Sequence, residues 1–247
     1  MAIHSTNDSG GPPSGWKIQL FANISGSEPF VVQVAIQMTE LVDASMIPEA
    51  KRDELREAIL AITFDGLMPA FEHLKQIRAS ARENVPELNR RQNYEDFTIS
   101  LWRAYKDLMP RAVKLMGFDI GFLFQNDTIF EKGLTAFVSA RPKDLTPFRP
   151  YLRAQRDKWQ NELARFRNFL EHKSDANPSA FKSRYEPSHA EELFDAAWQA
   201  IAEVLAALIS MHFPPGVTLV EIPPEQRNAA LPRRFGFAME GIPPSGV

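Results

Sequence analysis

The chain has 247 residues, of which 44% are hydrophobic and 24% charged, and its formal net charge is −3. Such a chain can bury a substantial core as one large domain or two small ones, and its composition is that of a soluble globular protein. The charge excludes a polycation, so nucleic-acid binding would need a local basic patch. The absence of cysteine excludes disulfides, thiolate metal sites and a cysteine nucleophile, and it fits a reducing compartment.

The N-terminal segment has no secretory signal. Residues 1–14 contain neither a basic region nor an apolar stretch, so we expect a disordered leader and a cytoplasmic protein. Residues 15–37 contain two β-rich runs around residues 24–29, which predicts a hairpin. Helical spacing in residues 30–40 favours a helix there instead, and the sequence alone leaves both interpretations open.

The middle of the chain has the periodicity of helices. A helix is expected from Pro48, bent or broken at Gly66 and Pro69 and then resuming. A second helix is expected to kink at Pro110 and to end at Gly117. An apolar linker follows, which we expect to be buried, and then a short helix capped by Asp127. Further helices are predicted over about 150–172 and 188–212, separated by a loop.

The predicted fold is mainly α, a helical bundle with a small β element made of the N-terminal hairpin and a C-terminal strand. That strand is expected within residues 216–222, and residues 223–247 are expected to form a loop-like tail. Residues 15–222 would then form a single domain. The most apolar helical stretch, residues 196–213, is interrupted by Gln199 and Glu203 and is predicted to be too short for a membrane span.

Common catalytic motifs are absent from the sequence. It has no Gly-rich phosphate loop, no His-Glu-x-x-His, no Gly-x-Ser-x-Gly elbow and no dinucleotide fingerprint. A metal site made from His172, Asp175 and His189 is conceivable, but no spacing demands it. We therefore expect neither a metal nor a cofactor.

The helix over 150–172 separates an apolar stripe from a polar face. On a wheel of about 100° per residue, five residues share the stripe: Leu152, Trp159, Leu163, Phe166 and Leu170. Asn168 lies nearly opposite this stripe, and His172 lies beside Asn168. Arg153, Arg156 and Arg167 line one flank of the polar face. The polar residues are therefore expected to face solvent or another chain.

This helix also ends a basic segment. Residues 141–173 contain nine Lys or Arg and four Asp or Glu, a charge of +5, which leaves −8 for the rest of the chain. A basic stretch that leads to an Arg and His pair suits a phosphate-bearing ligand. A solvated arginine-rich helix, stabilised by cations near its C-terminus, is the alternative that charge alone favours.

Arg167, Asn168 and His172 form an Arg-Asn-x-x-x-His motif that resembles the signature of the HEPN superfamily. The resemblance covers about residues 94–212, with the motif in a late helix followed by a loop and a final apolar helix. It implies a helical bundle and a metal-independent endoribonuclease, of the kind found in toxin–antitoxin and anti-phage systems. A toxin's antitoxin or a sensor protein would then be a partner. The tyrosine that some toxin members carry after the histidine is missing here.

The resemblance assigns roles to particular residues. His172 would transfer a proton, Arg167 would stabilise phosphoryl charge, and Asn168 would orient the phosphate or the histidine. Arg153, Arg156 and Lys173 would bind the RNA substrate. Arg167 and His172 are five residues apart, so a regular helix separates them by about 140°. We therefore predict a homodimer in which two motifs meet across a two-fold axis.

Two other interpretations stay open from the sequence. The polar face could serve a non-catalytic helical interaction module, or the basic stretch could belong to an RNA-binding regulator without cleavage. The Arg-x-x-x-x-His spacing alone is not specific, since residues 184–189 also have it, in a predicted loop and without the asparagine.

Overall fold

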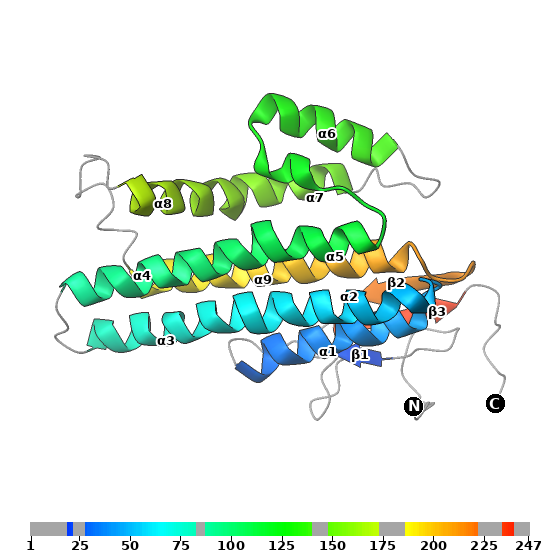
Figure 1. Cartoon of the computed structure of the whole chain (residues 1–247), viewed down its shortest axis with the longest axis horizontal. Coiled ribbons are helices and arrows are strands. Elements are labelled where there is room, and N and C mark those ends of the chain that lie inside the picture. Colours follow the sequence, from blue (N-terminus) through cyan, green and yellow to red (C-terminus); the bar gives the residue numbers. More distant parts are fainter. Residues whose placement is uncertain are drawn as a thin grey trace.

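The computed structural model describes residues 19–21, 28–82, 87–139, 148–172, 186–221 and 234–239. The described part is a mainly α helical bundle, which confirms the predicted fold class (Figure 1). The expected leader, residues 1–14, lies outside the described residues. The helices are α1 (Glu28–Ala44), α2 (Glu49–Ile62), α3 (Met68–Arg82), α4 (Glu87–Trp102), α5 (Met109–Leu115), α6 (Asp127–Ser139), α7 (Phe148–Gln155), α8 (Asn161–His172) and α9 (Pro187–Ser210).

Short π-helical segments join three pairs of these helices into long continuous rods. They are η1 (Thr63–Leu67) between α2 and α3, η2 (Arg103–Leu108) between α4 and α5, and η4 (Arg156–Gln160) between α7 and α8. The chain therefore stays helical through Gly66 and Pro69, and of the predicted bend or break, the break is wrong. Pro69 and Pro110 each follow a π segment closely. A proline ring clashes with the carbonyl four residues earlier, and we infer that the wider π turn relieves that clash.

The end of α5 is at the glycine that the sequence indicated. Gly117 has a φ of 82°, the left-handed conformation that glycine adopts without strain. Its N–H donates to the carbonyl of Lys114 at 2.9 Å, and the N–H of Phe118 donates to that of Val113 at 3.1 Å. This pair of bonds is the Schellman arrangement, which satisfies two carbonyls at the helix end. The chain then enters the 3-10 turn η3 (Gly121–Phe124), where Leu123 is buried as expected of the linker.

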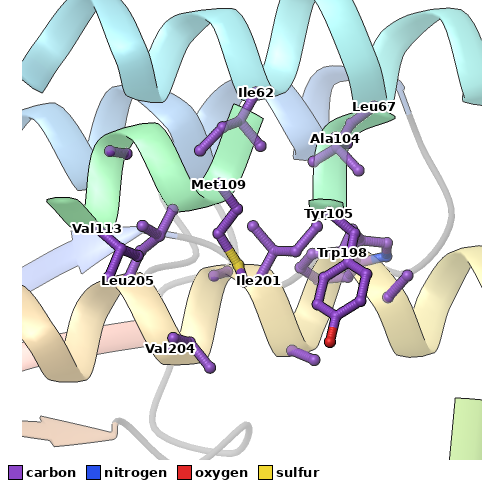
Figure 2. Packing of buried hydrophobic residues seen from close by; sticks show 14 of the residues in the cluster. Ile62, Leu67, Ala104, Tyr105, Met109, Val113, Trp198, Ile201, Val204 and Leu205 are labelled. Atoms are coloured by element: carbon purple, nitrogen blue, oxygen red, sulfur yellow. The ribbon is translucent and has the colours of Figure 1, made fainter. Parts of the chain in front are cut away.

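The helices share one apolar core, with α9 at its centre. Figure 2 shows Ile201 and Leu205 of α9 beneath Met109 and Val113 of the α4–α5 rod. Two cavities in this core, one between α1, α2 and α9 and one between η2, η4 and α9, have volumes of about 20 and 10 Å³. Each volume is close to that of a single water site. A small-molecule substrate therefore has no room in either of them.

The small β element differs from the prediction in two ways. The expected hairpin is wrong, because its second run lies in α1, which agrees with the competing helix prediction. Within the described residues of this region, β1 (Gln19–Phe21) is a strand. Strand β2 (Val217–Glu221) is confirmed. The tail expected to be a loop contains β3 (Arg234–Met239). β3 is the middle strand of the sheet and pairs antiparallel with both others, for example Leu20 with Phe235 and Leu219 with Phe237.

Helix α9 has nearly the bounds that the sequence predicted, Pro187–Ser210 against about 188–212. With 24 residues and an 18-residue window of mean hydropathy 1.4, it is long and apolar enough to cross a membrane, so the prediction that its apolar stretch is too short is wrong. However, 67% of that apolar window is buried inside the bundle. In Figure 1 α9 runs beside α4 and α5 along the long axis of the molecule. This placement explains its apolar composition by packing, because a central helix must be apolar on several faces.

Tyr105 is a buried core residue whose hydroxyl has no hydrogen-bond partner among the described residues. Burial raises its pKa well above the usual value near 10, and the charge of Arg156 lowers it by less. The pKa of Tyr105 is higher in the folded protein than in the unfolded chain. The stability that depends on its neutral hydroxyl is therefore fully present below about pH 10, and it is lost as the pH rises through the folded pKa. Tyr105→Phe should remove this alkaline loss.

Urea unfolding at pH 7 and at about pH 10.5 tests this expectation. At pH 7, Tyr105→Phe should be as stable as the wild type or up to about 1 kcal/mol more stable, because it removes an unpaired buried hydroxyl. At the higher pH the difference should widen in favour of the variant. An equal alkaline loss in both proteins would show that Tyr105 does not control it.

Candidate functional site

Helix α8 carries the Arg-Asn-x-x-x-His motif and lies along α4 (Figure 1). Trp159, Leu163 and Phe166 are at most 1% exposed, which confirms their place in the predicted apolar stripe. The ring of Phe166 meets that of Tyr94 on α4 edge to face, with centroids 6.2 Å apart. These contacts fix the rotation of α8 about its own axis, and so they determine which of its side chains remain at the surface.

The three motif residues differ in their surroundings. Asn168 is exposed, as the wheel predicted. Arg167 is half-buried, and its guanidinium lies 5.1 Å from the centre of the Trp102 ring at the end of α4. His172 is the last residue of α8, and its side chain lies outside the described residues, as does all of Lys173. The α-helix is regular from Asn161 to His172, so the separation of about 140° between Arg167 and His172 holds in the structure.

The predicted substrate residue Arg156 is not on the polar face. It is 8% exposed, and its guanidinium donates to the carbonyls of Leu123 and Gln125 at 3.2 and 2.7 Å. Its Nη2 also donates to the carboxylate of Asp127 at 2.9 Å. The prediction is wrong because Arg156 lies at the edge of the apolar stripe, where η3 and the start of α6 cover it. Arg156 therefore holds these two segments together and cannot reach a ligand.

Arg153 is at the surface, as expected, but it is paired. Its Nε donates to Glu131 of α6 at 2.7 Å, and a second bond runs from Nη2 to the same carboxylate. These bonds lower the pKa of Glu131. A substrate phosphate would therefore have to displace this carboxylate.

The N-cap of α6 differs from the prediction. The side chain of Asn126, not that of Asp127, accepts a hydrogen bond from the N–H of Ile129 at 3.1 Å.

The second Arg-x-x-x-x-His spacing has a different setting. His189 lies in the first turn of α9, and its Nε2 is 3.5 Å from Glu162 of α8. Arg184 lies outside the described residues. His189 is thus turned to the contact between α8 and α9, which makes it a matched control for His172. The conceivable metal site with Asp175 also falls outside the described residues; within them, no three His, Asp or Glu side chains form a metal-binding group.

Trp102 lies at the boundary between core and surface and has a second cation beside it. Lys106, one turn further in η2, places its ammonium 5.1 Å from the centre of the same ring. Trp102 itself is partly buried against the core and meets Tyr105 edge to face. The spacing from Trp102 to Lys106 was visible in the sequence. The approach of Arg167 was not, because it depends on how α8 packs against α4.

Comparisons of the chain with protein families, with curated proteins and with solved structures find no match. Function is therefore inferred from the residues of α8, α4 and η2 and from their chemistry.

Proposed function

We propose that the protein is a metal-independent endoribonuclease of HEPN type, with Arg167, Asn168 and His172 as its catalytic residues. The observation that carries the proposal is the position of the motif. It lies on a regular helix with Asn168 exposed and Arg167 at the surface between α8 and α4, next to a second cation. Clustered cations at an accessible surface favour a phosphate-bearing polymer.

The reaction needs only groups that the protein and RNA supply. The 2′-oxygen attacks the adjacent phosphorus as its proton passes to one His172, and the bond from phosphorus to the 5′-oxygen breaks. The partner's His172 protonates the leaving 5′-oxygen, so the products are a 2′,3′-cyclic phosphate and a 5′-hydroxyl end. A histidine titrates near neutral pH and can take either role. Arg167 would donate two hydrogen bonds to the phosphoryl oxygens as their charge grows.

A homodimer follows from the helix geometry. Within one chain, Arg167 and His172 are separated by about 140° around α8, which is a poor arrangement for gripping one phosphate. A two-fold axis at this face would bring an Arg167 and a His172 from different chains together. A protein that stays monomeric at all workable concentrations, measured by light scattering, would contradict this part of the proposal.

The setting we propose is the cytoplasm, where the enzyme would act as a toxin or an anti-phage effector controlled by an antitoxin or sensor protein. Expression of the wild type should then slow growth, and expression of His172→Ala should not. Equal growth with both would argue against a toxic activity.

The direct test is RNA cleavage in EDTA by the wild type, His172→Ala, Arg167→Ala and the control His189→Ala. Loss of a general acid–base or of a charge-stabilising donor costs roughly a factor of 10²–10⁴ in rate. We expect losses of that size for the two motif variants, whereas His189→Ala should cleave like the wild type. Equal cleavage by all four proteins, or none by any, would refute the catalytic assignment. Unfolding midpoints should be measured for each variant, because Arg167 packs on Trp102.

The contact of Arg167 and Lys106 with Trp102 also favours a second candidate, an RNA-binding regulator that does not cleave. This candidate predicts salt-sensitive RNA binding by a protein without EDTA-resistant cleavage. Binding would survive His172→Ala.

A further inference from the structure

Two cations from different helices gather at one aromatic ring. Lys106 of η2 and Arg167 of α8 each lie 5.1 Å from the centre of the Trp102 ring. Attraction to the ring helps to hold both side chains in place. Two cations beside one ring give this surface a local positive potential, which attracts a negatively charged group.

Another lysine in the same protein shows how such a charge is otherwise neutralised. Lys75 lies over the ring of Phe71 at the same distance, 5.1 Å, and its ammonium pairs with Glu72 at 2.7 Å. Lys106 has no such partner: among the described residues, no carboxylate lies within ion-pair distance of its ammonium. Its charge is thus available to a ligand.

We propose that Lys106 and Arg167, positioned by Trp102, form a phosphate subsite that binds the RNA strand beside the catalytic motif. The identity of the ligand rests on the proposed function. Because Trp102 holds the two cations, the subsite contacts the RNA backbone and reads no base edge. Backbone contacts position a strand without selecting its sequence. The protein therefore accepts RNA strands of different sequence at this subsite, and Trp102 acts as a positioning residue.

The test measures binding of two labelled 20-residue RNAs, an oligouridylate and a mixed sequence, by fluorescence anisotropy. All proteins carry His172→Ala to prevent cleavage, and salt is varied between about 50 and 200 mM. Adding Lys106→Ala should weaken binding of both RNAs by a similar factor, about 3 to 10 at the lowest salt. The slope of log affinity against log salt should fall by about 0.7, the value for one lost contact to a single strand.

Lys75→Ala is the matched control, because it removes a lysine from an equivalent ring contact outside the α4–α8 surface. It should change neither the affinity nor the slope. A Lys106→Ala protein that behaves like Lys75→Ala would overturn the subsite, and so would a loss confined to one RNA sequence. Trp102→Phe should retain most of the Lys106-dependent slope, whereas Trp102→Leu should lose it. Equal slopes for these two would overturn the positioning role.

The outcomes separate this proposal from the proposed function. Cleavage that depends on His172 but is accompanied by no Lys106 effect on binding would reject the subsite and keep the nuclease. A Lys106-dependent salt slope without any cleavage by the wild type would reject the nuclease and keep the subsite as an RNA-binding surface.

Discussion

Arg156→Ala is expected to lower the free energy of unfolding by about 3 kcal/mol, near the lower end for removing one partner of a buried charged contact. The guanidinium is the hydrogen-bond donor for the carbonyls of Leu123 and Gln125, and it stacks 4.4 Å from the centre of the Phe130 ring. Removing it leaves these carbonyls without their donor, which costs more than the bonds themselves contribute. Asp127 is largely exposed, so water can replace its lost partner. Urea unfolding at pH 7 measures the loss.

The neighbouring Arg153 supplies the control for this prediction. It also pairs with a carboxylate on α6, but both side chains are well exposed. Surface pairs of this kind contribute little, because water and salt screen them. Arg153→Ala should therefore shift the unfolding midpoint far less than Arg156→Ala. Arg156→Lys should recover less than half of the loss, since an ammonium cannot reproduce the planar fork of donors. Equal shifts for Arg153→Ala and Arg156→Ala would contradict a structural role for Arg156.

Arg156 also shows where sequence reasoning about the site reached its limit. The apolar stripe of α7 and α8 follows from periodicity alone, and Trp159, Leu163 and Phe166 confirm it. The residues at the edge of the stripe do not follow, because their exposure depends on segments far away in the sequence. At one edge position η3 and α6 cover Arg156; at another, Arg167 meets α4. Asn168, which lies opposite the stripe, is exposed as the helical wheel predicts.

In the fold, too, features set by neighbouring residues were predicted, whereas features set by segments far away in the chain were not. The end of α5 at Gly117 and the strand β2 were predicted because glycine conformation and β-branched residues act locally. Strand β3 was missed, since its flanking prolines and arginines indicate a loop and its two partners lie at opposite ends of the chain. The sequence of α1 fits both the two-residue period of a strand and the 3.6-residue period of a helix, and only packing against α2 and α9 decides between them.

A second large loss of stability is expected from substitution of Gly66, where the π segments η1 and η2 touch. A Cβ atom at this position would lie 2.6 Å from the Cβ of Ala104 and 2.8 Å from its Cα. The second contact is with backbone, so no side-chain rotation can relieve it, and η1 and η2 would have to move apart. Overpacking lowers the free energy of unfolding by about 1–3 kcal/mol and occasionally more. The higher helix propensity of alanine offsets up to about 1 kcal/mol of this loss. We expect Gly66→Ala to lose about 2 kcal/mol net.

Asp65→Ala, at the exposed residue before it in η1, should stay within about 0.5 kcal/mol of the wild type, as surface substitutions do. The double variant Gly66→Ala with Ala104→Gly tests the contact itself. It should be less destabilised than the sum of the two single variants, because the pair of Cβ atoms no longer clashes. The rescue should be incomplete, since the Cα of residue 104 remains 2.8 Å from the new Cβ. Strictly additive losses would mean that η1 and η2 do not meet at this glycine, and that the register of the two long rods is set elsewhere.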